Sequence, residues 1–151
     1  MKLVGSIDIT APATAVWELL VDPSALAGCI PGVSDVRQVD DRTFEGGIRA
    51  SIGPVDGDFA FRSVLARSEF PDHLVVEIDG TDSVTHSRVT AHVEANLTVP
   101  VPTTTTLRYV ATVTTRGRLA IVGEMVLRAT AGAMIGQVTR CLRSRLEEPV
   151  R

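Results

Sequence analysis

Residues 89–99 read Val-Thr-Ala-His-Val-Glu-Ala-Asn-Leu-Thr-Val, the clearest structural signal in the chain. Apolar side chains occupy every odd position, and polar side chains occupy every even position. Successive side chains of a β-strand point to opposite faces, so this stretch predicts a long strand with one apolar face and one solvated face. Strands of that kind are typical of antiparallel sheets that cover a core on one side only.

The same alternation recurs along the chain, in residues 3–9, 44–52, 59–65, 74–79 and 107–114. Residues 10–23 instead show helical spacing and end at Pro23. From about Leu119 to Glu148 the chain has no proline and carries a broad apolar stripe. This pattern predicts one helix of about 30 residues, or about 45 Å. We therefore expect an α+β fold in which an antiparallel sheet of about six or seven strands curls around a long C-terminal helix, with short helices after the first strand.

Composition narrows the class of protein. The 151 residues carry a net charge of −3 and 44% hydrophobic residues, which fits a single globular domain over 1–151. The absence of basic blocks argues against nucleic-acid binding. The sequence shows neither the continuous apolar region of a signal peptide nor an apolar run of about 20 residues, so we expect a cytoplasmic protein.

Cys29, which precedes Ile-Pro-Gly, is the first candidate for chemistry. A nucleophilic cysteine needs a nearby base, whereas His73 and His92 fall on the polar faces of strands. We interpret Cys29 as a small buried residue at a corner of the chain. Cys29 and Cys141 are far apart in sequence and predict neither a disulfide framework nor a zinc site. With no metal cluster and no catalytic constellation in the pattern, we expect a protein that is not an enzyme.

Small residues are frequent on both sides of the expected interior. Ala91, Ala95 and Ala111 point inward from strands, and Gly123 and Ala131 lie on the helix. Such residues either let the sheet and helix close together or leave volume that must be filled. Composition alone leaves both alternatives open.

Several motifs resemble the START-like, or Bet v 1-like, helix-grip superfamily, and within it the CoxG family of carbon monoxide dehydrogenase accessory proteins. They are Ala11-Pro12, Val16-Trp17, Asp22-Pro23, Cys29-Ile30-Pro31-Gly32, Gly53-Pro54-Val55 and Gly117-Arg118-Leu119-Ala120. The resemblance implies a non-enzymatic accessory protein of a molybdenum hydroxylase of the carbon monoxide dehydrogenase type, acting in recruitment, maturation or electron transfer to the quinone pool. It also implies a ligand cavity for a quinone (menaquinone-like) or a lipid, with no covalent cofactor.

The strand phases and the family together predict the residues that line this cavity. They are Phe59, Phe61, Val93, Leu97, Tyr109 and Val113 from the sheet, and Leu127, Thr130, Met134 and Val138 from the helix. We expect the Tyr109 hydroxyl to donate to a ligand head group; the alternative is a core tyrosine that reaches water.

Three further expectations concern function. An aromatase/cyclase-like enzyme on the same fold and a ligand-free assembly factor remain alternatives to the carrier. Arginines near the end of the last helix favour anionic lipid, but Glu147 and Glu148 offset them. We therefore expect membrane contact to be at most peripheral, at the inner face of the membrane.

Overall fold

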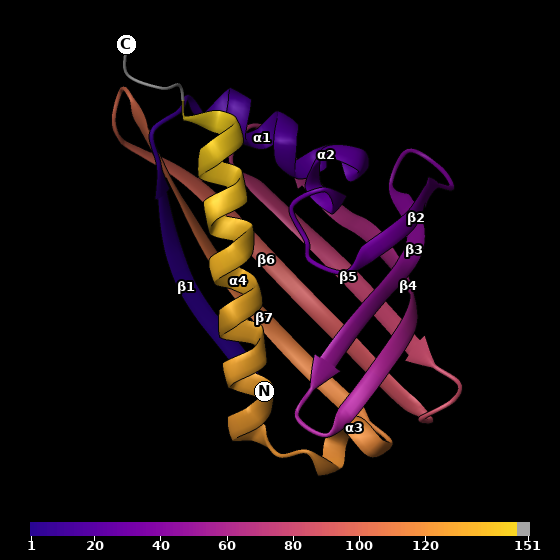
Figure 1. Ribbon diagram of the computed structural model, residues 1–151. Coiled ribbons are helices and arrows are strands. Elements are labelled where there is room, and N and C mark those ends of the chain that lie inside the picture. The colour runs from indigo at the N-terminus through magenta and orange to yellow at the C-terminus, as the bar shows by residue number, and fades with distance from the viewer. Residues whose placement is uncertain (148–151) are drawn as a thin grey trace.

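A seven-stranded antiparallel sheet and a long helix across one of its faces make up the fold (Figure 1). The computed structural model describes residues 1–147. In chain order the elements are β1 (Lys2–Ile9), α1 (Ala13–Val21), α2 (Pro23–Ala27), β2 (Val33–Gln38), β3 (Thr43–Ile52), β4 (Val55–Glu69), β5 (His73–Asp82), β6 (Ser87–Val101), β7 (Thr104–Arg116), α3 (Arg118–Ile121) and α4 (Glu124–Leu146). The spatial order β1-β7-β6-β5-β4-β3-β2 places the first strand beside the last, which confirms the expected helix-grip arrangement.

The alternation that predicted the sheet is confirmed in β6. Ala95 and Leu97 are buried on the side of the helices, whereas His92, Glu94 and Asn96 are exposed on the other side. Each strand pairs with its neighbours in antiparallel register. A one-residue slip would move every one of these side chains to the opposite face, so the pattern also specifies the register.

The single long C-terminal helix that the sequence predicts is wrong at its start. The chain first forms the short helix α3, then breaks at Gly123, whose φ is 100°, and only then begins α4. A positive φ of this size suits glycine, which has no Cβ. The 23 residues of α4 span about 34 Å at 1.5 Å per residue. The expectation for Glu148 lies outside the described residues.

Within residues 1–147, no helix combines the length and the apolar character that crossing a membrane requires.

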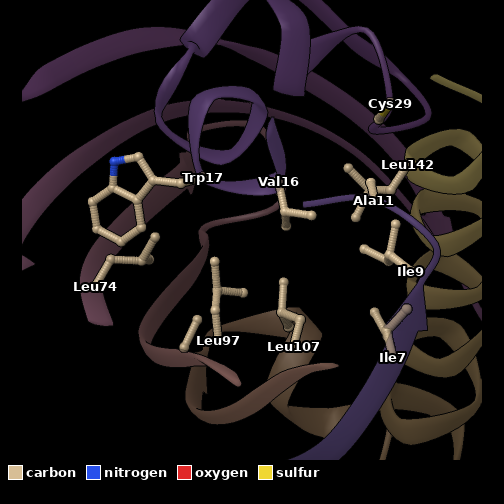
Figure 2. Packing of buried hydrophobic residues seen from close by; sticks show 11 residues of the cluster. Ile7, Ile9, Ala11, Val16, Trp17, Cys29, Leu74, Leu97, Leu107 and Leu142 are labelled. Carbon is tan, nitrogen blue, oxygen red and sulfur yellow. The ribbon is translucent and has the colours of Figure 1, made fainter. Parts of the chain in front are cut away.

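The hydrophobic core occupies one end of the molecule, beneath α1 and the C-terminal part of α4 (Figure 2). Its fully buried members include Ile9, Val16 and Leu142. At the same end the buried Thr105 hydroxyl donates to the Ala11 carbonyl over 2.7 Å, which satisfies a backbone acceptor where the chain leaves β1. The core therefore fixes α1 and one half of α4.

Side chains of α4 attach it to the edge of the sheet along β1. Arg128 and Arg143 donate to the carbonyls of Lys2 and Asp8, over 3.0 Å and 3.1 Å. Beyond the helix, the Glu147 carboxylate accepts from the Thr10 amide over 2.9 Å. These bonds also cover the outer edge of β1, which would otherwise present unpaired backbone groups.

A disulfide joins Cys29 to Cys141, so the prediction of an isolated buried cysteine at position 29 is wrong. The two Cα atoms lie 5.4 Å apart although 112 residues separate them in sequence. Cys29 is buried as expected. Its partner comes from α4, and beside the bond the Arg145 guanidinium donates to the Ala25 carbonyl over 2.9 Å. The bond therefore ties the C-terminal half of α4 to the turn after α2.

We expect the double variant Cys29→Ser/Cys141→Ser to be less stable than the parent by roughly 2–4 kcal/mol, because the crosslink closes a long loop and restricts the unfolded chain. Chemical denaturation followed by Trp17 fluorescence measures the change. A reductant should lower the stability of the parent to that of the variant and leave the variant unchanged. Equal stability of oxidised and reduced parent would contradict the expectation.

Candidate functional site

The space between α4 and the sheet is incompletely filled. Within Glu124–Leu146, Leu142 alone is buried. Opposite the helix, Ala111, Val93 and Val76 form a row of cross-strand neighbours and are all half-buried. In a closed interior, apolar side chains of this kind reach nearly full burial. The arrangement leaves an accessible apolar surface beneath the N-terminal half of α4.

The six predicted residues of the sheet all lie on strands, with differing burial. Phe61, Val93, Tyr109 and Val113 are half-buried, so part of each side chain remains accessible. Phe59 is buried and folds its ring over Gly57 of the same strand, where a Cβ would collide with it. Leu97 is buried within the core beneath α1 (Figure 2).

The four predicted residues of α4 are Leu127, Thr130, Met134 and Val138, and all are half-buried. The Thr130 hydroxyl donates to the Val126 carbonyl over 3.0 Å, within the helix itself. Val138 packs against the hydrophobic core. Leu127 and Met134 are thus the residues of this set with accessible apolar side chains in the N-terminal two-thirds of the helix.

Tyr109 lies against the backbone of Gly5, its cross-strand partner in β1. A Cβ at position 5 would collide with the Tyr109 hydroxyl and ring. The glycine therefore makes room for the tyrosine to lie over β1, and the ring packs at the border of the core. In the sequence, Gly5 interrupts the inward-facing series Leu3, Ile7 and Ile9, and this interruption is the signal for the position of the ring.

Charged side chains point away from this interior. Within residues 1–147 every lysine and arginine is exposed. His73 contacts Glu69 and Glu94, and His92 contacts Glu77, on the outer face as the alternation predicts.

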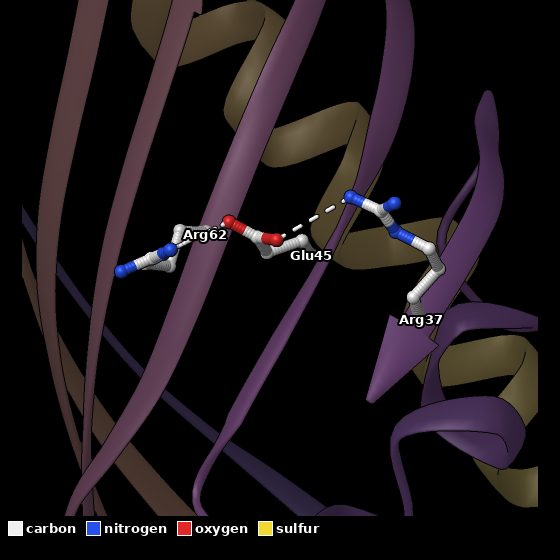
Figure 3. Close-up of polar contacts among 3 residues, drawn as sticks. All are labelled: Arg37, Glu45 and Arg62. Carbon is white, nitrogen blue, oxygen red and sulfur yellow. Dashed lines mark hydrogen bonds and ion pairs between the residues drawn. The ribbon is translucent and has the colours of Figure 1, made fainter. Parts of the chain in front are cut away.

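Ion pairs cross the outer face of the sheet from strand to strand. Glu45 pairs with Arg37 and Arg62, over 3.4 Å and 2.8 Å (Figure 3), and Asp79 pairs with Arg88 over 2.7 Å. The hydrogen bond from Arg88, together with its charge, lowers the pKa of Asp79. Exposed pairs of this kind contribute little stability each.

Two open hollows of about 440 Å³ and 480 Å³ lie among these side chains. Both contain Glu45, Ala60 and Phe61; the first extends to Asp35 and Arg37 of β2 and the second to Arg88 of β6. The charges around them are already paired across the sheet, so the hollows offer a ligand little unsatisfied polarity.

One carboxylate is buried, at the end of the molecule opposite the core. Asp82 accepts hydrogen bonds from the amides of Asp58, Val84 and Thr85, over 3.0 Å, 2.9 Å and 3.4 Å. These donors, the Asp58 amide first, lower its pKa below 3.8. Nearby, the buried Ser87 hydroxyl accepts from Thr85 and from the Leu119 amide, which anchors α3. The hydrogen bonds show that this charge serves the hairpin.

We expect Asp82→Asn to lower the free energy of unfolding at pH 7. Because the folded pKa is depressed, the carboxylate stabilises the protein above about pH 4 and loses this effect as the pH falls through the folded value. The stabilities of parent and variant should therefore converge below that pH. Urea denaturation between pH 3 and pH 7 measures the difference; a gap independent of pH would argue against a charged Asp82.

Among the described residues, no group of three or more His, Cys, Asp or Glu side chains can hold a metal ion. Neither cysteine has a free thiol, since both are in the disulfide.

Comparisons with known proteins agree with the architecture. A conserved protein from Geobacillus kaustophilus superposes with a TM-score of 0.89 at 22% identity, covering 96% of this chain and 94% of that one. A START superfamily protein from Mycobacterium smegmatis gives a TM-score of 0.71 at 14% identity, covering 97% of each chain. The Zhui aromatase/cyclase from Streptomyces sp. R1128 gives 0.73 at 14% identity, covering 100% of this chain and 96% of that one. At these identities the likeness shows the fold.

No curated protein sequence matches the chain. The family model for CoxG of carbon monoxide dehydrogenase matches residues 5–147.

Proposed function

The chain belongs to the CoxG family of carbon monoxide dehydrogenase, and we propose that it is a non-enzymatic accessory protein that holds a hydrophobic ligand between α4 and the sheet. The observation that carries the proposal is the half-buried apolar surface on both sides of this space. A ligand that covers Val93, Val113 and Leu127 would remove apolar area from water, at roughly 25 cal/mol per Å².

The charges of the chain favour a neutral ligand, such as a quinone of the menaquinone type or an uncharged lipid. Every described lysine and arginine side chain is exposed, so a buried anionic head group would lack a partner. The Tyr109 hydroxyl is a polar group that borders the space, and it can donate to a carbonyl or hydroxyl oxygen.

Membership in the family supports the second part of the proposal, a role beside a molybdenum hydroxylase of the carbon monoxide dehydrogenase type. The protein would serve that enzyme in recruitment, in maturation, or in carrying electrons from it to the quinone pool. Electron transfer fits a quinone ligand, since the cofactor would supply the redox chemistry and the protein the apolar site.

Two other functions are less well supported. An aromatase/cyclase activity is suggested by the likeness to Zhui, but general acid–base catalysis needs ionisable side chains at the ligand. Of the candidates, Tyr109 borders the space, whereas His73 and His92 lie on the outer face in ion pairs. A ligand-free assembly factor would leave the half-buried surface unexplained.

The proposal predicts that organic extraction of the purified protein releases a neutral hydrophobic compound, detected by mass spectrometry. Leu127→Trp should abolish this compound because the larger side chain fills the space. Met125→Trp is the matched control: position 125 lies on the same helix but is 85% exposed, so the compound should remain.

Thermal unfolding of the two variants separates an open interior from a closed one. In an open interior Leu127→Trp is tolerated, whereas in a closed one the added volume costs about 1–3 kcal/mol. A parent protein that yields no compound from several hosts, together with a destabilised Leu127→Trp, would refute the carrier function.

A further inference from the structure

Two hairpin tips lie side by side at the end of the molecule that holds the core. One joins β4 to β5 and the other joins β6 to β7; the Leu97 amide donates to the Asp72 carbonyl between them over 2.8 Å. These tips expose Phe70, Val99 and Val101, with 63%, 53% and 51% of each residue accessible. We call these three residues the tip patch.

Phe70 is held in a fixed orientation. Its ring stands edge-on to Trp17, at a centroid distance of 5.7 Å and an interplanar angle of 82°. Trp17 is itself 5% exposed within the core. An exposed aromatic ring on a rigid support loses little conformational entropy when a partner covers it, and aromatic side chains dominate the energetics of protein interfaces.

The surroundings of the tip patch are acidic. Glu69 and Asp72 flank Phe70 in sequence, and Glu18 follows Trp17 in α1; all three are exposed. Arg67 is the nearby cation, paired with Glu69 over 3.7 Å. The excess of negative charge repels an anionic membrane surface and attracts a protein surface that carries lysine and arginine.

We propose that the tip patch is the docking surface for a partner protein that offers an apolar pocket bordered by lysine or arginine. The partner is the molybdenum hydroxylase, so this inference rests on the proposed function. Phe70 enters the pocket, Val99 and Val101 cover its margin, and the acidic side chains set the orientation and the rate of association.

The opposite end of the molecule supplies a control surface. Ile121 and Met125 are 84% and 85% exposed, more than the tip patch. They are aliphatic side chains beside Arg118 and Arg128. A contact driven by exposed apolar area alone would use this end as readily.

The test measures binding of the purified, fully assembled molybdenum hydroxylase of the same organism to the immobilised full-length protein. Phe70→Ser should weaken binding roughly tenfold or more, as truncation of an aromatic anchor does. Ile121→Ser/Met125→Ser should leave the affinity within about twofold, since scattered surface positions contribute little. Glu69→Lys/Asp72→Lys should slow association and reduce its dependence on salt.

The outcomes separate the two proposals. Binding by the parent that Phe70→Ser leaves intact overturns the docking surface but not the proposed function. No binding by the parent overturns the partnership and, with it, this inference. Flotation with phosphatidylglycerol vesicles that depends on Phe70 would instead assign the tip patch to a membrane. Trp17 fluorescence and thermal unfolding of each variant verify that it is folded.

Discussion

The attachment of α4 at its margins, rather than along its whole length, governs the organisation of the molecule. Arginine side chains bind it to β1, and the disulfide of Cys141 fixes its C-terminal half. At the other end, Val122 and Val126 pack against Gly53 in the turn between β3 and β4. A helix held in this way keeps its distance from the middle of the sheet without close packing there.

This arrangement separates stability from ligand binding. The packed core and the disulfide stabilise one end, and the hydrogen bonds of Asp82 and Ser87 organise the other. The middle is free to remain incompletely filled, a condition that would cost stability in an ordinary core because unfilled volume loses van der Waals contacts. A ligand that fills it would add the missing contacts.

The charges follow the same division. On the outer face, Glu45 and Asp79 are paired with arginines across neighbouring strands, which leaves that face without an unpaired cluster. At the tips the charges of Glu18 and Asp72 surround an exposed ring instead. One fold thus presents a neutral interior for a small molecule and a separate charged surface for a protein.

The sheet, its two faces and the helix-grip class could all be predicted from the order of the residues, because alternation such as that of residues 89–99 is a local property that each strand expresses alone. The same pattern placed Val93, Tyr109 and Met134 on the surfaces that face one another. The pairing of Cys29 with Cys141, the support of Phe70 by Trp17 and the break at Gly123 emerged only from the folded chain. The first two join residues far apart in the chain, and the third depends on where α4 must start to meet the sheet; no local pattern encodes such distances.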